Sequence, residues 1–397
     1  MPAPTPIRSL TIWQPAIPLR EKFQHAAGAR ETSRPLIVSI ELSDSTVGYG
    51  ETHPRDYVTG ETTEDAILTI RETLAPMLVH LHPENFGEAI EAASNLPLTD
   101  ADGKVITAAR AAVELALLDA YSKHFQRSLA ALAGWIDERW LGAPGSRQTV
   151  RFSGVLSGDD PARVVRSLRK MRLFGLRDFK LKVGDEHDEA RLDAVIHRLD
   201  RGLARGKLSL RVDANAAWSI DEAERRLNGW EELPITCVEQ PLAKSDLDAW
   251  STLASRTNLP LMADESLVTP ADAEALIAAR AASWFNIRIS KNGGLIPALR
   301  LALLAHQHNI QYQLGCMVGE TSILSAAGRW FLQLVPGVAF AEGSFGKFLL
   351  AEDITAKSLR FGWAGRWKPM AGFGLGVTVD ESRLESLCTD RPMQIPL

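Results

Sequence analysis

The sequence has few cysteines and no long apolar run. Its three cysteines, Cys237, Cys316 and Cys388, are an odd number with no close pair, which excludes a disulfide framework and a cysteine metal site. No stretch reaches the roughly 18 apolar residues of a membrane helix, and the first residues lack the pattern of a secretion signal. We therefore expect a cytoplasmic protein that does not enter a membrane.

The sequence also lacks a cluster of basic residues. The formal net charge of −5 comes from scattered acidic residues, and no basic run could follow a phosphate backbone, so we expect no nucleic acid partner. The chain has 397 residues, of which 45% are hydrophobic and 23% are charged. This is the profile of a folded protein with a large core, and the length favours two domains.

The first part of the chain changes from a strand pattern to a helix pattern. The segments SLTIWQ, PLIVSIELSD and TVGYGETHP alternate and are rich in β-branched residues, which predicts a small antiparallel sheet over residues 7–63. From residue 64 to about residue 132 the spacing is that of amphipathic helices, most clearly in ITAARAAVELALLDAYSKHF. We therefore predict an α+β domain over residues 1–135.

A strand followed by a polar turn and an amphipathic helix recurs seven times from residue 148 onward. The first unit is VRFSGVL with DDPARVVRSLRKMRL, the last is IQYQLGCMV with ETSILSAAGRWFLQL, and VAFAEGS adds an eighth strand. Units of roughly 25 to 30 residues fit a parallel barrel better than an open sheet. The predicted fold is α/β, with a TIM-like parallel (β/α) barrel over residues 148–345 and a tail, residues 346–397, that returns to the first domain.

Acidic side chains end three consecutive strands of the predicted barrel, where the active sites of such barrels lie. Asp213, Glu239 and Asp264 are 26 and 25 residues apart, which is one strand-helix unit each. Three carboxylates without a histidine or a thiolate form a site of hard oxygen ligands, which suits Mg²⁺ better than zinc, with Mn²⁺ as a possible substitute. A helix cap or a solvated loop would explain any one of these acids alone, but the set of three predicts a metal site.

Lysines lie on two sides of this predicted site. Lys180 and Lys182 are two residues apart in FKLKVG, so both point into the mouth of the barrel. Lys291 follows strand six, across the barrel from strand two. A buried lysine is costly unless it has a partner or a task, and one of these ammonium groups could remove a proton while another returns one. A lysine pair by itself could also be a solvated edge or a phosphate contact.

The motifs FKLKVG, RVDANAAWS, VEQPL, ADES and NIRISKNGG together resemble the enolase superfamily, and in particular its muconate lactonizing enzyme subgroup. GYGETHPRDYVTGET resembles the capping domain of that family, and the similarity extends over nearly the whole chain. The resemblance implies a barrel with an α+β capping domain built from the first part and the tail. It also implies a homo-oligomer and Mg²⁺-dependent removal of the proton α to a carboxylate, through an enediolate.

The resemblance further implies roles for individual residues. Lys182 and Lys291 would be the acid/base groups, and Lys180 would lower the pKa of Lys182 through its like charge. Asn215 and Glu265 would support the metal site or contact the substrate. The metal ligands implied by the resemblance are the three acids found above, Asp213, Glu239 and Asp264. A mandelate-racemase-like enzyme would have a histidine at the end of strand seven, but YQLGCMVGET has none.

Several residues are candidates for substrate contacts. Dipeptide epimerases of this family commonly show Asp-x-Asp in strand eight, but this chain has Glu342 in AEGSF and no second acid, which weakens a dipeptide assignment. Arg288 could offer a fork to a second carboxylate or form a structural salt bridge. Glu320 could contact the substrate or cap the next helix. The other candidates are Ser153 at the end of strand one and Phe23, His25 and Arg30 in the first loop.

The expected activity is that of a racemase, epimerase or cycloisomerase acting on a small carboxylate, such as an amino-acid derivative, a dipeptide or a muconate. A dehydratase that uses the same lysines, similar to o-succinylbenzoate synthase, is the alternative. A barrel that binds a carboxylate without catalysis is a further alternative, since fold alone does not fix function. None of the expected ligands or lysines is missing, which favours an enzyme.

Overall fold

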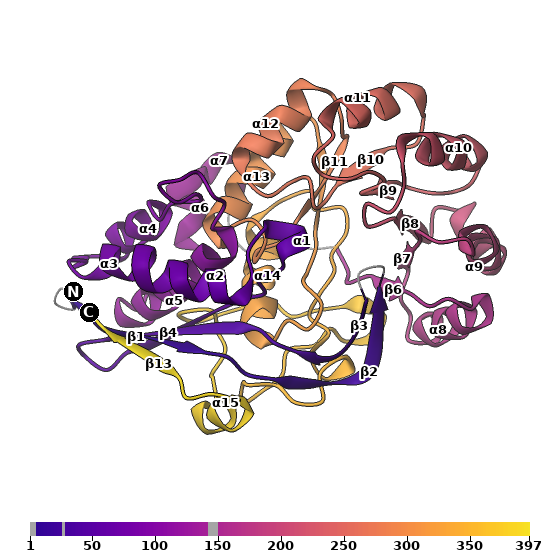
Figure 1. The fold of residues 1–397 in the computed structure, drawn as a ribbon. Coiled ribbons are helices and arrows are strands. Elements are labelled where there is room, and N and C mark those ends of the chain that lie inside the picture. Colours follow the sequence, from indigo (N-terminus) through magenta and orange to yellow (C-terminus); the bar gives the residue numbers. More distant parts are fainter. Residues whose placement is uncertain (1–4, 26–27, 142–149) are drawn as a thin grey trace.

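The computed structural model describes residues 5–25, 28–141 and 150–397, without the side chains of residues 21–30. The chain forms an α+β capping domain and a parallel barrel that lie side by side (Figure 1). The sheet of the capping domain has the order β13-β1-β4-β5, and its members run antiparallel. Its strands are β1 (Ile7–Trp13), β4 (Leu36–Leu42), β5 (Val47–Thr52) and β13 (Met393–Pro396).

Two strands of the capping domain were not predicted. They are β2 (Ile17–His25) and β3 (Gly28–Ser33), which pair with each other, while Leu19 on β2 also bridges Leu350 in the tail. Their sequences, IPLREKFQH and GARETS, carry charges where a half-buried strand would alternate apolar and polar residues. The alternation rule therefore gives no signal for this hairpin.

The helices of the capping domain cover one face of its sheet. The longest, α5 (Thr107–His124), lies against β5, where a Cβ atom on Gly48 or Gly50 would come within 2.3 Å of its backbone. Glycines on the strand and alanines on the helix permit this close approach. The other helical segments are α1 (Asp56–Thr59), α2 (Thr63–Thr69), the π-helix η1 (Ile70–Leu74), α3 (Ala75–Leu78), α4 (Phe86–Ser94), α6 (Ala131–Ile136) and α7 (Glu138–Leu141).

The barrel has seven parallel strands in sequence order, each followed by a helix, which confirms the predicted fold class. The strands are β6 (Gly154–Leu156), β7 (Asp178–Lys182), β8 (Ser209–Asp213), β9 (Val238–Glu239), β10 (Leu261–Ala263), β11 (Trp284–Ile287) and β12 (Gln311–Leu314). The helices are α8 (Pro161–Leu173), α9 (Asp188–Leu203), α10 (Ile220–Trp230), α11 (Leu247–Arg256), α12 (Pro270–Ala278), α13 (Leu295–Gln307) and α14 (Ser322–Leu334).

The predicted eighth strand, VAFAEGS, is reduced to single bridges. Ala341 bridges Leu314 on β12 and also Phe152, which precedes β6, so that this residue joins the two edges of the sheet. Gly343 and Ser344 then have φ values of 111° and 48°, which end the extended conformation. The ring therefore closes through one residue instead of a full strand.

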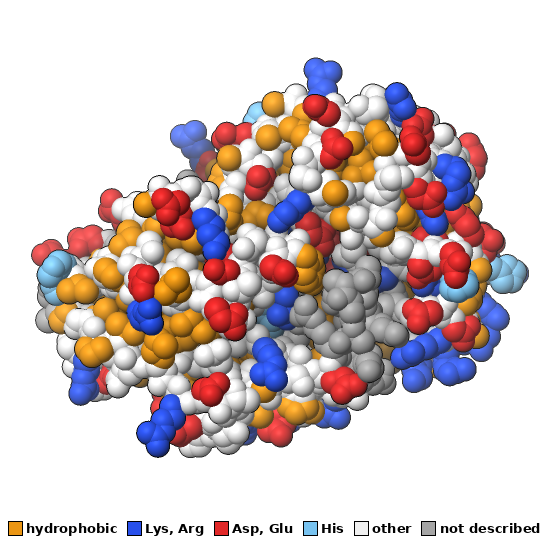
Figure 2. Space-filling model, viewed as in Figure 1, with side chains coloured by type: hydrophobic (Ala, Val, Ile, Leu, Met, Phe, Trp, Pro, Cys, Tyr) orange, Lys and Arg blue, Asp and Glu red, His pale blue; other side chains and the backbone are white. Residues whose placement is uncertain are grey.

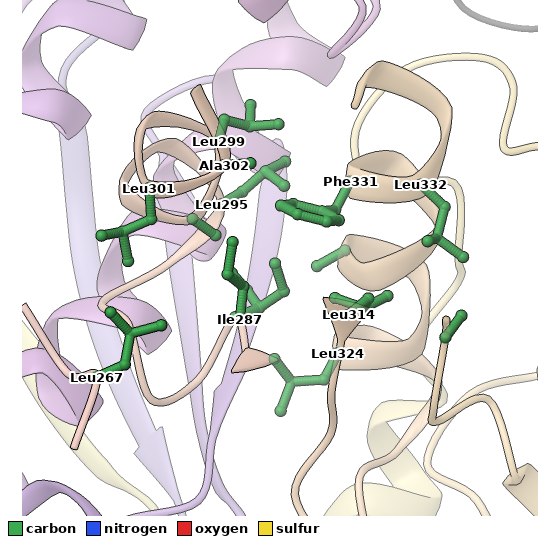
Figure 3. Close-up of a cluster of buried hydrophobic side chains, with 14 of the residues drawn as sticks. Leu267, Ile287, Leu295, Leu299, Leu301, Ala302, Leu314, Leu324, Phe331 and Leu332 are labelled. Atoms are coloured by element: carbon green, nitrogen blue, oxygen red, sulfur yellow. The ribbon is translucent and has the colours of Figure 1, made fainter. Parts of the chain in front are cut away.

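Side chains alternate between the inside of the barrel and the surrounding helices. On β11 and β12, Ile287 and Leu314 are at most 2% exposed and pack outward against α13 and α14, where they meet Leu295 and Phe331 (Figure 3). Because a strand has a period of two, the residue after Ile287, Arg288, points inward. The inside of the barrel is polar at its carboxyl end.

Buried carboxylates of the capping domain hold the barrel helices next to it. Glu51 on β5 accepts hydrogen bonds from the N–H groups of Thr321 and Leu324, at the start of α14. Glu114 on α5 accepts hydrogen bonds from the N–H groups of Leu295 and Ile296, at the start of α13. A carboxylate is favourable at a helix N-terminus because it satisfies free N–H groups and meets the positive end of the helix dipole.

The tail, which contains η2 (Gly346–Phe348), η3 (Trp363–Gly365) and α15 (Glu381–Leu387), ends in β13 on the sheet of the capping domain. Charges of both signs are scattered over the face shown in Figure 2, with hydrophobic side chains between them. Among the described residues, none of the helices combines the length and the apolar character required to span a membrane.

Candidate active site

The predicted site residues meet at the carboxyl end of the barrel strands. Lys180 and Lys182 are on β7, and Asp213 and Glu239 are the last residues of β8 and β9. Asp264 directly follows β10. The three acids are fully buried and are joined by hydrogen bonds or ion pairs to lysines and an arginine. The structure therefore brings together the three acids and the two lysines of β7.

Lys180 is a buried counter-ion. Its Nζ lies 3.2 Å from Asp213 Oδ2, 3.2 Å from Glu239 Oε2 and 2.8 Å from Glu342 Oε2. Burial alone would lower the pKa of this lysine, but the three carboxylates raise it above its usual value. Lys180 therefore stays charged and neutralises carboxylates from β8, from β9 and from the segment that follows α14.

Lys182 is the most accessible lysine of the site. Its Nζ donates hydrogen bonds to Asp213 Oδ2 at 2.7 Å and to Asn215 Oδ1 at 2.6 Å, and 18% of its side chain is exposed. Asn215 and Ala216, directly after β8, have positive φ values of 46° and 61°, as does Gln240 after β9, at 40°. Such backbone conformations are uncommon outside glycine and cluster at functional sites.

Lys291, the predicted partner of Lys182, is completely enclosed. Its Nζ donates hydrogen bonds to the backbone oxygens of Asp264 and Asn286, at 2.6 and 2.9 Å, and to Asp264 Oδ1 at 3.0 Å. Burial and the nearby Arg288 lower the pKa of Lys291, whereas its three acceptors favour the charged form. The structure does not bring the ammonium group of Lys291 into contact with solvent, so a role for it in proton transfer stays a prediction.

Arg288 takes the inward position at the end of β11. Its Nη2 bonds Asp264 Oδ2 and lies 3.7 Å from Glu239 Oε1. Its Nη1 contacts only Met317 Sδ, at 3.6 Å, and its Nε is buried without a hydrogen-bond partner among the described residues. Arg288 was predicted either to bind a second carboxylate of the substrate or to form a structural salt bridge, and the structure contains a salt bridge to Asp264.

The charges of the site balance. Burial and the neighbouring Asp213 raise the pKa of Glu239 and of Glu265, while Lys182 and Lys180 lower the pKa of Asp213 against the effect of its burial. One oxygen of Glu265, Oε2, is buried without a partner among the described residues. The site holds five acids and five cations. Four of the acids, Asp213, Glu239, Asp264 and Glu342, form ion pairs with Lys180, Lys182, Arg211, Arg288 and Lys291, whereas Glu265 accepts a hydrogen bond from Asn215 Nδ2 at 3.3 Å.

The donor set suits a hard divalent cation, because three buried carboxylates come from three adjacent strands. In the described part of the chain, however, no three acidic, histidine or cysteine side chains stand close enough to hold an ion as they lie. Lys180 pairs with Asp213 and Glu239, Lys182 with Asp213, and Arg288 with Asp264. The residues present fit Mg²⁺ by their chemistry, and a bound ion would compete with these cations for the carboxylate oxygens.

The other predicted contacts are divided between the barrel interior and the mouth. Ser153 Oγ accepts a hydrogen bond from Arg211 Nη2 at 2.9 Å, inside the barrel. Glu342 pairs with Lys180 and Arg211, which lower its pKa against the effect of burial. Glu320 does not cap α14, whose cap is Thr321; it accepts the N–H of Met317 at 2.6 Å, and burial raises its pKa to about 8. The side chains of Phe23, His25 and Arg30 are outside the described residues.

Sequence reasoning missed four polar residues that support the site. Arg211, Asn286 and Gln313 lie inside the barrel, where Asn286 Nδ2 and Gln313 Nε2 donate to Glu239 at 2.8 and 3.4 Å. Gln240 Oε1 accepts the N–H groups of Asp264 and Ser266, which fixes the end of β10. Arg211 and Asn286 are two residues before Asp213 and Arg288, so the period of two that located the site could have found them.

Comparison with known proteins gives the same assignment over most of the chain. Residues 7–134 match the model of the mandelate racemase/muconate lactonizing enzyme N-terminal domain, and residues 163–383 match the enolase C-terminal domain-like model. The chain is 31% identical over 327 residues to the N-succinyl-L-Arg/Lys racemase of Bacillus cereus, which is 81% of this chain and 82% of that protein. It is 31% identical over 364 residues to muconate cycloisomerase 1-2 of Acinetobacter lwoffii, covering 89% of this chain and 88% of that one.

Solved structures show the same fold. The crystal structure of the Bacillus cereus racemase superposes with a TM-score of 0.83 at 27% identity and covers 98% of this chain and 100% of that chain. A dipeptide epimerase from Cytophaga hutchinsonii, solved with Mg and the dipeptide D-Ala-L-Val, has a TM-score of 0.82 at 22% identity and covers 98% and 99% of the two chains. This chain is therefore an enzyme that belongs to the mandelate racemase/muconate lactonizing enzyme family of the enolase superfamily.

Proposed function

We propose that this enzyme removes the proton α to the carboxylate of a small substrate, with Mg²⁺ bound and with Lys182 as the base. The observation that carries the proposal is the position of the Lys182 ammonium group. It stands at the carboxyl end of β7 beside the acids, and 18% of the side chain is exposed, against 3% for Lys180 and 0% for Lys291. Lys182 is therefore the lysine that a substrate in the mouth of the barrel can reach.

The neighbours of Lys182 suit it to hold a proton. In its neutral form the amine takes the substrate proton, and Asp213 and Asn215 then accept hydrogen bonds from the ammonium group. Lys180 keeps its charge between Asp213, Glu239 and Glu342, so these acids do not repel an anionic substrate. Members of the family depend on a divalent metal. Mg²⁺ held by Asp213, Glu239 and Asp264 would supply positive charge for the substrate carboxylate and for the enediolate that proton removal creates.

The two cations that follow β11, Arg288 and Lys291, help to distinguish the possible reactions. Racemisation or epimerisation by two groups needs a second proton donor across the substrate, which is the role predicted for Lys291. Cycloisomerisation needs one group that transfers a proton. Lys291 is completely enclosed, and the guanidinium of Arg288 at the inward position keeps its proton, so these two residues favour a reaction that uses Lys182 alone. We therefore propose cycloisomerisation before racemisation or epimerisation, with dehydration by the same lysine as the alternative.

The acidic residues at the mouth of the barrel indicate whether the substrate has a free amino group. An ammonium group on a substrate needs a carboxylate partner, but Glu342 is already paired with Lys180 and Arg211, and Glu265 is buried and hydrogen-bonded to Asn215. The proposed metal ligands would be used by the ion. This arrangement supports a substrate without a free amino group, such as an N-acylamino acid or a muconate, over a free dipeptide.

Deuterium exchange tests the proposal directly. The enzyme is incubated with Mg²⁺ in D₂O against N-succinylamino acids, dipeptides and muconates, and the products are followed by mass spectrometry. We expect uptake of deuterium at the α-carbon, or ring closure, for at least one member, and loss of the reaction when EDTA removes the metal. A reaction that continues unchanged in EDTA would contradict the metal dependence.

Assembly and location follow from the sequence prediction only. We propose that the enzyme is a homo-oligomer, because the family resemblance implies assembly, and that it works in the cytoplasm, because its three cysteines include no close pair that would suit an oxidising compartment. Light scattering of the purified protein would measure the number of subunits. A monomer at micromolar concentration would contradict the first part of this proposal.

A further inference from the structure

The side chain of Arg288 lies among the proposed metal ligands. Its Nη2 bonds Asp264 Oδ2 and is 3.7 Å from Glu239 Oε1, so one guanidinium nitrogen faces two of the three carboxylates. The two acids are on neighbouring strands, and both are fully buried. A cation of the protein itself therefore occupies the space in which a metal bound by these acids would lie.

We propose that Arg288 is the resident counter-ion of the metal-free site, and that Mg²⁺ must displace its guanidinium from Asp264 in order to bind. The inference rests on the proposed magnesium site and adds to it the residue that sets its affinity. Arg288 then has two positions: paired with Asp264 when the metal is absent, and turned away from Asp264 when the metal is present.

Electrostatics requires this exclusion. Five cations of the described site already pair with Asp213, Glu239, Asp264 and Glu342, so a divalent ion adds two positive charges to carboxylates that already have partners. Like charges about 4 Å apart repel by several kcal/mol even at the effective dielectric constant of a protein surface. A guanidinium that stays on Asp264 would also use an oxygen that the metal needs. The ion and the guanidinium cannot share this carboxylate at low cost.

The hydrogen bonds of Lys291 and Arg288, the two cations that follow β11, indicate which of them moves when the metal binds. Lys291 donates to three acceptors, two of which are backbone oxygens that do not move with a side chain. Arg288 pairs with Asp264, lies 3.7 Å from Glu239 Oε1, makes a weak contact to Met317 Sδ, and leaves its Nε without a partner among the described residues. A buried donor without an acceptor is costly, so Arg288 loses less by leaving. Arg288 is the mobile cation and Lys291 is the fixed one.

Metal titration of variants tests this proposal. Calorimetry measures the Kd for Mg²⁺ of the wild-type protein, R288Q and R288K, without any substrate. We expect R288Q to bind Mg²⁺ at least about tenfold more tightly, because the competing charge is gone. R288K keeps a charge on a shorter side chain and should lie between the two. The matched control is R211Q, which removes the same charge from the same barrel but from a residue that pairs with Glu342 instead of the proposed ligands.

The outcomes separate this inference from the proposed function. Equal or weaker Mg²⁺ binding by R288Q, or equal tightening by R211Q, would overturn the role of Arg288, because the effect would then be absent or one of general charge. E239Q and D264N test the ligand set. If both bind Mg²⁺ as the wild-type protein does, the metal site itself is wrong, and the inference falls with it.

A second measurement follows the wild-type protein and uses a variant only to assign a signal. The ¹⁵N side-chain signals of arginines become visible by NMR when a guanidinium is held in an ion pair. We expect one such signal, identified by its absence from R288K, to shift or broaden when Mg²⁺ is added. A signal that is unchanged at saturating Mg²⁺ would show that Arg288 stays on Asp264, which would overturn the proposal.

Discussion

The two sides of the barrel mouth carry cations in similar number but in different states. On the β7 side, Lys180 is buried among acids, and Lys182 is exposed at the mouth. On the β11 side, Arg288 continues the inward alternation of the strand, and Lys291 is enclosed by backbone oxygens. Each side has one cation that is held by several acceptors and one that has fewer partners. The group with fewer partners is a lysine on one side and an arginine on the other.

This difference teaches that residue type at the inward position decides the chemistry of each side. A neutral lysine can accept a proton, whereas a guanidinium provides charge and hydrogen bonds but does not exchange its proton at ordinary pH. The proposed proton transfer is therefore assigned to the β7 side, and the proposed control of the metal is assigned to the β11 side. Substitutions on each side can break or sharpen this contrast.

The largest effect is expected from K182A. Removing the base should slow deuterium exchange into a substrate found in the D₂O experiment by about 10³-fold, because a positioned general base contributes about 10² to 10⁴. K182R is the matched variant, since it keeps the positive charge beside Asp213 but does not give up its proton. If K182R kept the wild-type rate, Lys182 would act only as a charge, and the two sides would not differ in the way described.

Much of this contrast can be anticipated from the sequence, and one part cannot. The length of the strand-helix unit and the period of two along a strand predicted the fold and brought Lys180, Lys182 and the three acids to one mouth. For β11, the same rules predict which of Arg288 and Lys291 points into the barrel only if the last residue of the strand is known. Because β11 ends at Ile287, Arg288 continues the alternation, while Lys291 falls in the following turn. The boundary of a short strand depends on packing with its neighbours, which a single sequence does not display.

Lys291 tests the other side of the contrast. K291M should lower the free energy of unfolding by about 3 kcal/mol, because the change leaves part of a buried charge pair and two backbone oxygens without their partner. Chemical denaturation measures this change, and K207M, at an exposed lysine, is the control. The alternative outcome is equally definite. A K291M protein that is stable, exchanges the α-proton and yet fails to complete turnover would identify Lys291 as the second acid/base group and make the two sides chemically alike.

The smallest effect is expected at Glu320. Its carboxyl group accepts a hydrogen bond from the N–H of Met317, whose sulfur contacts Arg288. Burial raises the pKa of Glu320 from 4.5 to about 8, so the folded protein keeps this proton while the unfolded chain releases it. The folded state binds more protons between about pH 4.5 and 8, and stability therefore falls as the pH rises through this window.

E320Q is neutral in both states and can still accept a hydrogen bond from the N–H of Met317. Its stability should therefore not show the part of the pH dependence that comes from Glu320. We expect the Tm of E320Q relative to wild type to rise by roughly 3 °C between pH 5 and pH 8. Glu61, whose pKa burial raises to about 7, acts equally in both proteins, so the difference reports Glu320. Calorimetric scans at the two pH values, with E138Q as the exposed control, measure it. An equal Tm difference at both values would mean that Glu320 is charged in the folded protein and that the β11 side holds one more negative charge than described.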